Sequence, residues 1–213
     1  MLFSFIGVAL FYSSKSFSKR LVSQPIIHTT AIIDAGAIIG NGTRIWHFCH
    51  VMPQAVIGSN CILGQNVFVD NNVIIGNGVK IQNNVSVYNG VVFEEDVFIG
   101  PSVVFTNVIN PRSFIDRKKE FKTTRVQKGA SIGANATIIC GVTIGEYAMI
   151  GAGAVITKDV PAYALLVGNP GRQVGWVSEA GTSLQFNNEG KAVCPIDSQE
   201  YNLKNSSVYK VLL

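Results

Sequence analysis

The chain has little charge and no apolar run long enough to cross a membrane. Asp, Glu, Lys and Arg supply 14% of its 213 residues, and the net charge is +4. Such a composition excludes a disordered chain and disfavours a nucleic-acid-binding protein, which needs a strongly basic surface. The apolar stretch from Leu2 to Tyr12 is about half the ~20 residues of a membrane-spanning helix. No positive charge precedes it, so we expect no signal peptide, no integral membrane span and a cytoplasmic protein.

Cysteine and histidine are also scarce. The four cysteines lack the paired spacing of a disulfide frame or a zinc site, so we expect no disulfides, no metal and a reducing compartment. Cys49 and Cys61 are expected to act as compact apolar side chains. The three histidines, His28, His47 and His50, all lie early in the chain, which disfavours a dedicated histidine base further along it.

What the chain does have is a period of six. Every sixth residue is large and apolar in two runs: Ile33, Ile39, Ile45, Val51, Ile57, Leu63, Val69, Ile75, Ile81, Val87, Phe93, Ile99 and Phe105, then Val126, Ile132, Ile138, Ile144, Ile150 and Ile156. This period fits neither the 3.6-residue turn of a helix nor the alternation of a long strand. The chain must therefore be a stack of short straight segments, a hexapeptide repeat.

The other positions of each hexad explain why the chain turns. Two residues before the large residue the side chain is small or β-branched, as at Cys49 and Ala55, which suits a crowded strand wall. Three residues after it Gly, Asn and Asp predominate, as at Asn60 and Asn66, and these types tolerate left-handed backbone angles. Each hexad is then a short strand and a tight corner. Three hexads per coil would make a triangular prism, and 18 residues per coil is what hexapeptide-repeat proteins are known to use. Neighbouring coils would hydrogen-bond as parallel strands about 4.8 Å apart.

One charged segment interrupts the repeat. The spacing between Phe105 and Val126 is not a multiple of six, so a loop must leave the prism there. Residues 107–125 hold six Lys or Arg against two Asp or Glu. This concentration favours an anionic ligand near the loop, although a solvated surface loop would have the same composition.

The pattern divides the chain into three parts. We expect an N-terminal extension at residues 1–26, which is either a packing or membrane-surface segment or the product of a start codon placed too far upstream. The all-β prism is expected at residues 27–162, with its loop at residues 107–125. A C-terminal closing segment and tail should occupy residues 163–213.

Several stretches resemble one enzyme family. The resemblance is carried by IWHFCH (Ile45 to His50), IGPSVVFTNVINPRS (Ile99 to Ser113) and the long run from Gly129 to Pro170 that ends in KDVPAYALLVGNP. These look like the bacterial hexapeptide-repeat sugar-nucleotide N-acetyltransferases. The likeness is greatest to enzymes that acetylate the 3-amino group of UDP-2-acetamido-3-amino-2,3-dideoxyglucuronic acid for O-antigen polysaccharides. It implies a left-handed parallel β-helix, assembled as a homotrimer with active sites between subunits.

The resemblance also implies which residues meet the acceptor sugar. Asn107, where the prism opens into the loop, matches an asparagine beside the sugar amino group. Asn107 is therefore the predicted catalytic residue, orienting the amine without removing its proton. Asn71, 36 residues earlier and in the same column, is interpreted as structural. The predicted acceptor-binding residues are Asn83, Asn84, Tyr88, Asn89 and Arg112, with Arg112 a candidate for a substrate carboxylate or diphosphate.

Acetyl-CoA is the implied acetyl donor, bound along the second run of hexads. The predicted cofactor-binding residues are Gly133, Gly151, Ala152, Lys158 and Arg172. Small side chains would let backbone amides meet the pantetheine arm, and the two cations would hold the phosphates. The alternative is that the small residues only fit tight corners.

The sequence thus predicts an acetyl-CoA-dependent N-acetyltransferase acting on a UDP-linked amino-uronic acid. A dTDP-3-amino-3,6-dideoxyhexose is the alternative acceptor, and it lacks the carboxylate that a loop arginine would bind. A γ-type carbonic anhydrase shares the prism, but its zinc needs well-separated histidines, whereas His47 and His50 are close together and none follows them. A non-catalytic β-helix scaffold would also show the period of six, yet it would have little reason for a basic loop in mid-prism.

Overall fold

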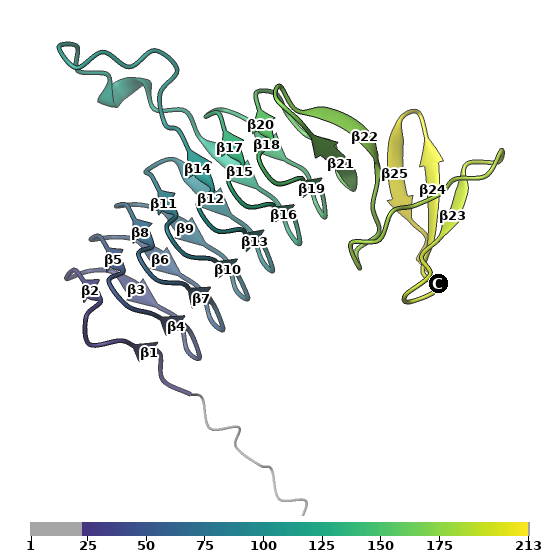
Figure 1. Cartoon of the computed structure of the whole chain (residues 1–213). Helices are drawn as coiled ribbons and strands as arrows, with labels where there is room; N and C mark the ends of the chain where they lie inside the picture. Colours follow the sequence, from purple (N-terminus) through teal and green to yellow (C-terminus); the bar gives the residue numbers. More distant parts are fainter. Residues whose placement is uncertain (1–22, 213) are drawn as a thin grey trace, which may run out of the picture.

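The computed structural model describes residues 23–212, which form a long prism followed by a small antiparallel sheet (Figure 1). The expectations for the N-terminal extension fall mostly outside these residues. Within residues 23–212 there is no helix of the length and apolarity that crossing a bilayer requires. The chain visits the three faces of the prism in turn, and we call them face 1, face 2 and face 3.

Each face is one sheet of very short strands. Face 1 has nine: β1 (Ile26–Ile27), β4 (Arg44–Ile45), β7 (Ile62–Leu63), β10 (Lys80–Ile81), β13 (Phe98–Ile99), β16 (Ser131–Ile132), β19 (Met149–Ile150), β21 (Ala164–Val167) and β22 (Arg172–Trp176). Face 2 has seven: β2 (Ile32–Ile33), β5 (His50–Val51), β8 (Phe68–Val69), β11 (Ser86–Val87), β14 (Val104–Phe105), β17 (Thr137–Ile138) and β20 (Val155–Ile156). Face 3 has six: β3 (Ile38–Ile39), β6 (Val56–Ile57), β9 (Ile74–Ile75), β12 (Val91–Phe93), β15 (Thr124–Val126) and β18 (Thr143–Ile144).

Neighbouring coils stack in a fixed register. Ile26 pairs with Arg44, and Arg44 pairs with Ile62, so one coil takes 18 residues. The strands of adjacent coils are parallel on all three faces. The predicted all-β fold, a parallel β-helix with a mid-prism loop and a C-terminal extension whose left hand was implied by the family resemblance, is confirmed.

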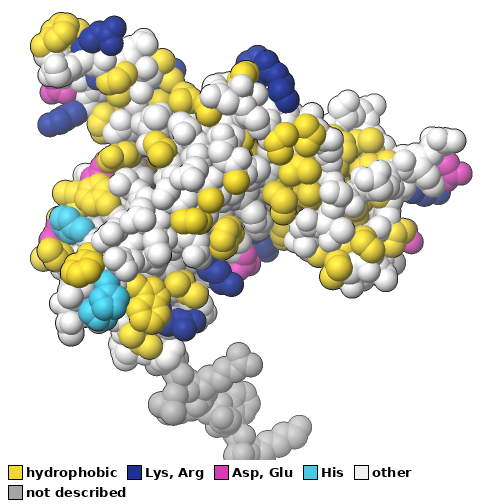
Figure 2. Space-filling model, viewed as in Figure 1, with side chains coloured by type: hydrophobic (Ala, Val, Ile, Leu, Met, Phe, Trp, Pro, Cys, Tyr) yellow, Lys and Arg dark blue, Asp and Glu magenta, His cyan; other side chains and the backbone are white. Residues whose placement is uncertain are grey.

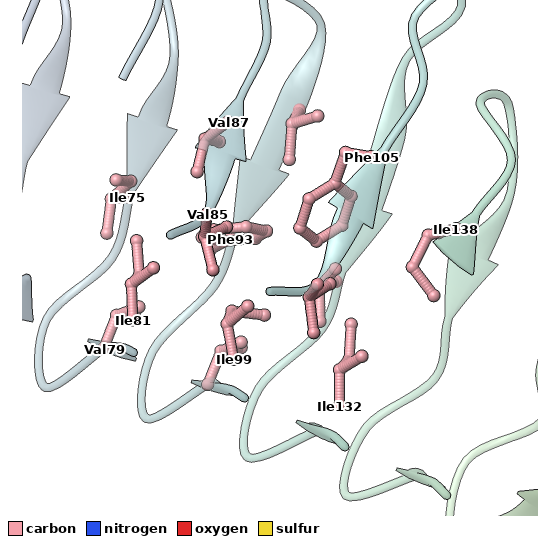
Figure 3. Packing of buried hydrophobic residues seen from close by; sticks show 14 of the residues in the cluster. Ile75, Val79, Ile81, Val85, Val87, Phe93, Ile99, Phe105, Ile132 and Ile138 are labelled. Carbon is pink, nitrogen blue, oxygen red and sulfur yellow. The ribbon is translucent and has the colours of Figure 1, made fainter. Parts of the chain in front are cut away.

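The predicted core residues fill the inside of the prism (Figure 3). From Ile45 onward the large residue of every hexad is buried, and Phe93 and Phe105 pack with ring centroids 5.4 Å apart. Cys49 and Cys61 lie in the wall position, where each Sγ donates to a carbonyl of the next coil. Their interpretation as buried apolar residues is confirmed, and burial raises the pKa of both thiols.

The corners have the left-handed backbone that the hexad predicts. Asn60 and Asn66 have φ of 59° and 58°. Phe48 and Tyr147 also have positive φ, at 57° and 54°, although their side chains disfavour it. The stacking register therefore imposes the corner conformation even where the residue type does not prefer it.

The loop leaves the prism without disturbing its register. Val126 stacks on Phe93, in the place that an uninterrupted repeat would give to residue 111. The intervening chain projects away from the prism (Figure 1) and contains one short 3-10 helix, η1 (Lys118–Glu120). The coil is thus completed by the residues that follow the loop.

The C-terminal residues close the prism and add a second core. Strand β22 runs antiparallel to β21 and ends face 1. Beyond it, β23 (Lys191–Val193), β24 (Glu200–Lys204) and β25 (Ser207–Lys210) form an antiparallel sheet. Tyr163, Leu184, Cys194 and Tyr201 belong to a separate buried cluster between this sheet and the prism.

We predict that Phe105→Ala lowers the free energy of unfolding by about 3–5 kcal/mol, because it leaves a cavity in the packed core. The control is Val104→Ala on the same strand, since the Val104 side chain faces outward and is 49% exposed. It should change stability by less than about 0.5 kcal/mol. Guanidinium unfolding curves measure both changes, and equal losses would contradict this assignment of the inward residues.

Candidate functional site

The loop leaves the prism at one edge, where several predicted site residues form columns. We call the turns between faces 2 and 3 the second corner, and those between faces 1 and 2 the first corner. Because coils stack in register, the residues two after each strand of face 2 lie above one another: Asn71, Asn89, Asn107, Cys140 and Lys158. Asn107 lies in the middle of this column, at the base of the loop.

Asn107 is half-buried at this point and its carboxamide is available. The backbone N–H of Lys122 donates to the Asn107 carbonyl at 3.0 Å, which closes the base of the loop. A Cβ on Gly141 would lie 3.1 Å from Cδ of Lys122, so the lysine stem packs against that glycine. Within residues 23–212 the Asn107 side chain makes no hydrogen bond. A donor and an acceptor are therefore free to meet a ligand.

Two threonines fix the base of the loop. The N–H of Cys140 donates to Oγ1 of Thr106 at 2.9 Å, and the N–H of Gly141 donates to Oγ1 of Thr124 at 3.2 Å. Thr124 is fully buried. Sequence reasoning missed both residues, although their position on either side of the break was the available signal.

The predicted acceptor residues divide between the two corners. Tyr88 and Asn84 line one shallow cavity of about 150 Å³ together with Ser86, and none of the described residues around it is charged. Asn83 and Asn84 belong to the first corner, where their Oδ1 atoms accept from the N–H of Gln65 and from the amide of Asn66. These two carboxamides tie coils together, unlike that of Asn107.

Asn89 stands one coil before Asn107 in the second-corner column. Its backbone N–H donates to Asp70 Oδ2 at 3.2 Å, while Asp70 Oδ1 accepts from the N–H of Asn71 at 2.8 Å. The Asn89 carboxamide makes no hydrogen bond within the described part of the chain. Its role in binding the acceptor stays a prediction.

Arg112 lies away from these residues. It lines a cavity of about 520 Å³ inside the projecting loop, together with Phe114 and Arg117. Its Nη1 donates to the carbonyl of Pro111 at 2.9 Å. Arg117 pairs with Glu120 at 2.8 Å, so part of the loop charge is neutralised within the loop. One chain does not bring Arg112 to the cavity beside Tyr88.

Two predicted cofactor residues do come together. Lys158 and Arg172 line one cavity of about 220 Å³, formed where strand β22 returns beside the second corner. Asp159 also lines it, and Asp159 Oδ1 accepts from the N–H of Thr143 at 2.7 Å. Both cationic side chains are exposed, so an anionic ligand could reach them.

Gly133, Gly151 and Ala152 lie on the first corner, across face 2 from Lys158. A Cβ on Gly133 would be 2.5 Å from the backbone nitrogen of Ala152, and one on Gly151 would be 2.8 Å from Val167. Coil stacking therefore requires both glycines. This favours the alternative interpretation, in which these small residues only fit tight corners. Their cofactor role stays a prediction, while Gly153 beside them faces open space.

The histidines lie at the N-terminal coils. His28 and His47 stack with ring centroids 3.5 Å apart, and His50 Nε2 lies 3.0 Å from Asp34 Oδ2. The second-corner column from Asn71 to Lys158 contains no histidine. Among residues 23–212, no three His, Cys, Asp or Glu side chains gather as a metal site would require.

Comparison with known proteins identifies the family of this prism. A family profile described as bacterial transferase hexapeptide (six repeats) matches residues 36–71 and 123–158, and the hexapeptide repeat of succinyl-transferase matches residues 54–89. The dTDP-3-amino-3,6-dideoxy-alpha-D-galactopyranose 3-N-acetyltransferase of Aneurinibacillus thermoaerophilus is 48% identical over 168 residues, which are 79% of this chain and 86% of that protein. The chain belongs to the hexapeptide-repeat sugar-nucleotide N-acetyltransferases.

Two further proteins are similar to parts of this chain. The bifunctional protein GlmU of Shouchella clausii is 32% identical over 141 residues, which are 66% of this chain but only 29% of that protein. The solved structure of LpxA, a UDP-N-acetylglucosamine acyltransferase from Bacteroides fragilis, has a TM-score of 0.57 at 22% identity. That match covers 72% of this chain and 62% of LpxA, and it supports the fold alone.

The prediction of a sugar-nucleotide N-acetyltransferase is confirmed at the level of the family, for which acetyl-CoA is the acetyl donor. The non-catalytic scaffold and the carbonic anhydrase are thereby set aside. The nucleotide in the name of the Aneurinibacillus relative is dTDP, whereas the sequence resemblance favoured UDP.

We predict that Thr106→Val destabilises the base of the loop by about 1–3 kcal/mol, because the Cys140 N–H loses its acceptor. Thr157→Val is the matched control. Thr157 directly follows β20, as Thr106 directly follows β14 on the same face, and the Thr157 hydroxyl makes no hydrogen bond within residues 23–212. Urea unfolding of both variants provides the comparison. Equal stability of the two variants would contradict a structural role for the Thr106 hydroxyl.

Proposed function

We propose that the enzyme transfers the acetyl group of acetyl-CoA to the 3-amino group of a dTDP-linked 3-amino-3,6-dideoxyhexose. The observation that carries the proposal is the similarity to a relative named for that reaction. The chain is 48% identical to this relative, and the match covers 86% of the relative's length. The cavity beside Tyr88 supports it, since none of the described residues around the cavity is charged. A deoxysugar methyl group suits such a lining, whereas a buried carboxylate would lack a cation.

The UDP-linked amino-uronic acid is the second candidate acceptor. The cations of the loop favour it, because Arg112 is exposed and offers a planar pair of donors to a carboxylate. Binding of the substrate carboxylate by Arg112 would require the loop to reach the cavity beside Tyr88, whereas in a single chain Arg112 lines the cavity inside the loop.

The second corner gives the two substrates a common path. Lys158 stands two coils from Asn107 in the column, on the order of 10 Å at the usual spacing of strands. We place the phosphates of acetyl-CoA at Lys158 and Arg172, with the pantetheine arm running along the corner toward Asn107. The acceptor sugar lies on the other side, near Tyr88 and Asn89. The thioester and the amine then meet at the Asn107 carboxamide.

The protein contributes to this reaction mainly by positioning the amine and the thioester. The amine nitrogen attacks the thioester carbon, a C–N bond forms and the C–S bond breaks. The nitrogen gives up one proton, the departing thiolate gains one, and coenzyme A leaves as its thiol. The free Asn107 carboxamide accepts from the amine and aligns its lone pair with the carbonyl. Its donor N–H can also face the charge that develops on the thioester oxygen.

Assembly as a homotrimer completes this arrangement. Gly151 and Ala152 lie on the first corner, whereas Lys158 and Asn107 lie on the second corner of the same face. Two copies packed with these corners facing each other would enclose acetyl-CoA between them. We retain the predictions of a cytoplasmic enzyme and of a product used in surface polysaccharides.

The acceptor is tested by following thiol release from acetyl-CoA with the full-length protein. We expect rapid release with a dTDP-3-amino-3,6-dideoxyhexose and at least tenfold lower kcat/KM with the UDP-3-amino-uronic acid. Arg112→Ala should leave the dTDP reaction unchanged. The reverse preference, together with loss of activity in Arg112→Ala, would replace the first acceptor by the second.

We predict that Asn107→Ala lowers kcat by about 10²–10³-fold, the size seen when one positioned donor is removed from a reaction centre. The dissociation constant for acetyl-CoA should stay within about twofold, because Lys158 and Arg172 are untouched. Asn71→Ala, two coils away in the same column, is the control and should retain activity. Equal losses of kcat and acetyl-CoA affinity in Asn107→Ala would contradict the proposed role.

A further inference from the structure

An aromatic row lies on the outer side of face 2, next to the cavity beside Tyr88. His50 on β5 and Phe68 on β8 are one coil apart, with ring centroids separated by 5.7 Å and planes inclined at 66°. On the next coil the outward residue is the small Ser86, and the Tyr88 ring approaches Phe68 with a centroid distance of 6.2 Å. Figure 2 shows histidines set among hydrophobic side chains on this side of the molecule.

The three rings of this row are not part of the prism core. Phe68, His50 and Tyr88 belong to neither buried cluster, and all three remain partly exposed. The His50 ring is nonetheless held in place, because its Nε2 contacts Asp34 Oδ2 at 3.0 Å. A fixed, half-exposed set of rings is a ready surface for stacking a flat ligand.

The charged side chains beside this aromatic row limit which part of a sugar nucleotide can bind to the row. Asp34 and Asp70 are both at the second corner next to it, with Asp70 held by the N–H groups of Asn71 and Asn89. These two carboxylates disfavour a diphosphate directly over His50 and Phe68. They favour an uncharged pyrimidine base, whose imide N–H can donate a hydrogen bond to a carboxylate oxygen.

The distances along the prism agree with a base at the aromatic row and a sugar amine at Asn107. Phe68 and His50 lie two and three coils before the coil of Asn107, about 10 and 14 Å along the prism. A nucleoside diphosphate separates its base from the hexose amine by a comparable span. An acceptor with its amine at Asn107 therefore carries its base to Phe68 and His50, while the sugar occupies the cavity at Ser86 and Tyr88.

We propose that His50 and Phe68 form the stacking subsite for the pyrimidine base of the acceptor nucleotide, with Tyr88 at its boundary with the sugar cavity. The inference rests on the proposed function for the identity of that acceptor. It assigns nucleotide affinity to a surface separate from the reaction centre at Asn107.

The test combines binding of dTDP alone, measured by calorimetry, with steady-state kinetics on the dTDP-3-amino sugar. Phe68→Leu keeps the apolar volume but removes the ring, so both the dTDP dissociation constant and the sugar-nucleotide KM should rise about tenfold. Values of kcat and of KM for acetyl-CoA should stay within about twofold. Phe68→Tyr restores a ring and should restore both constants. Ile74→Ala, on the same coil but facing outward from face 3 and 51% exposed, should change nothing.

Each outcome separates the subsite from the reaction. Loss of dTDP binding in Phe68→Leu supports the subsite even if no 3-amino sugar nucleotide is acetylated, in which case only the proposed function falls. Unchanged dTDP affinity and KM in an active Phe68→Leu enzyme would overturn the subsite and leave the reaction standing. A drop in oligomer mass by light scattering, with dTDP affinity unchanged, would also overturn it, because the row would then be a contact between copies.

Discussion

The structure depends on the hydrogen-bonded stacking of coils in an 18-residue register. Because every strand is only a few residues long, no strand is stable alone, and each is held by the coils on either side. The register decides which residue points inward, where the chain turns and which side chains form columns along an edge. It imposes positive φ even at Phe48 and Tyr147, whose side chains disfavour that region. A functional site on such a prism is therefore a set of residues related by the coil step.

The same rigidity allows the loop to carry function. The chain departs after Phe105 and resumes stacking at Thr124, so the core on both sides is continuous. Hydroxyl acceptors at Thr106 and Thr124 fix the two ends of the excursion. The loop can then vary or move without loss of the fold, while Asn107 at its base keeps a fixed position. Binding residues placed on loops over a rigid scaffold commonly work in this way.

The third edge of the prism serves a different purpose. Tyr147 lies flat over Gly129, where a Cβ would be 2.4 Å from the ring, and Tyr163 stacks on it with centroids 5.5 Å apart. Tyr201 of the C-terminal sheet packs edge-on against Tyr163, whose pKa is raised by burial and by nearby Glu179. This aromatic column joins the C-terminal sheet to the prism. Its contacts offset the cost of positive φ at two tyrosines, which residue preference alone would not have predicted.

The period of six by itself determined the prism, its inward residues, its corners and the place of the loop, because each follows from local spacing along the chain. It also put Asn107 in a column with Asn89 and Asn71. Only the tertiary structure decided that Lys158 and Arg172 share one cavity, since strand β22 must first fold back beside the corner. It likewise separated Arg112 from the cavity beside Tyr88, and showed that Gly133 and Gly151 are required by the coil above them. These relations depend on the path of a loop and on the return of the chain, which a local repeat does not encode.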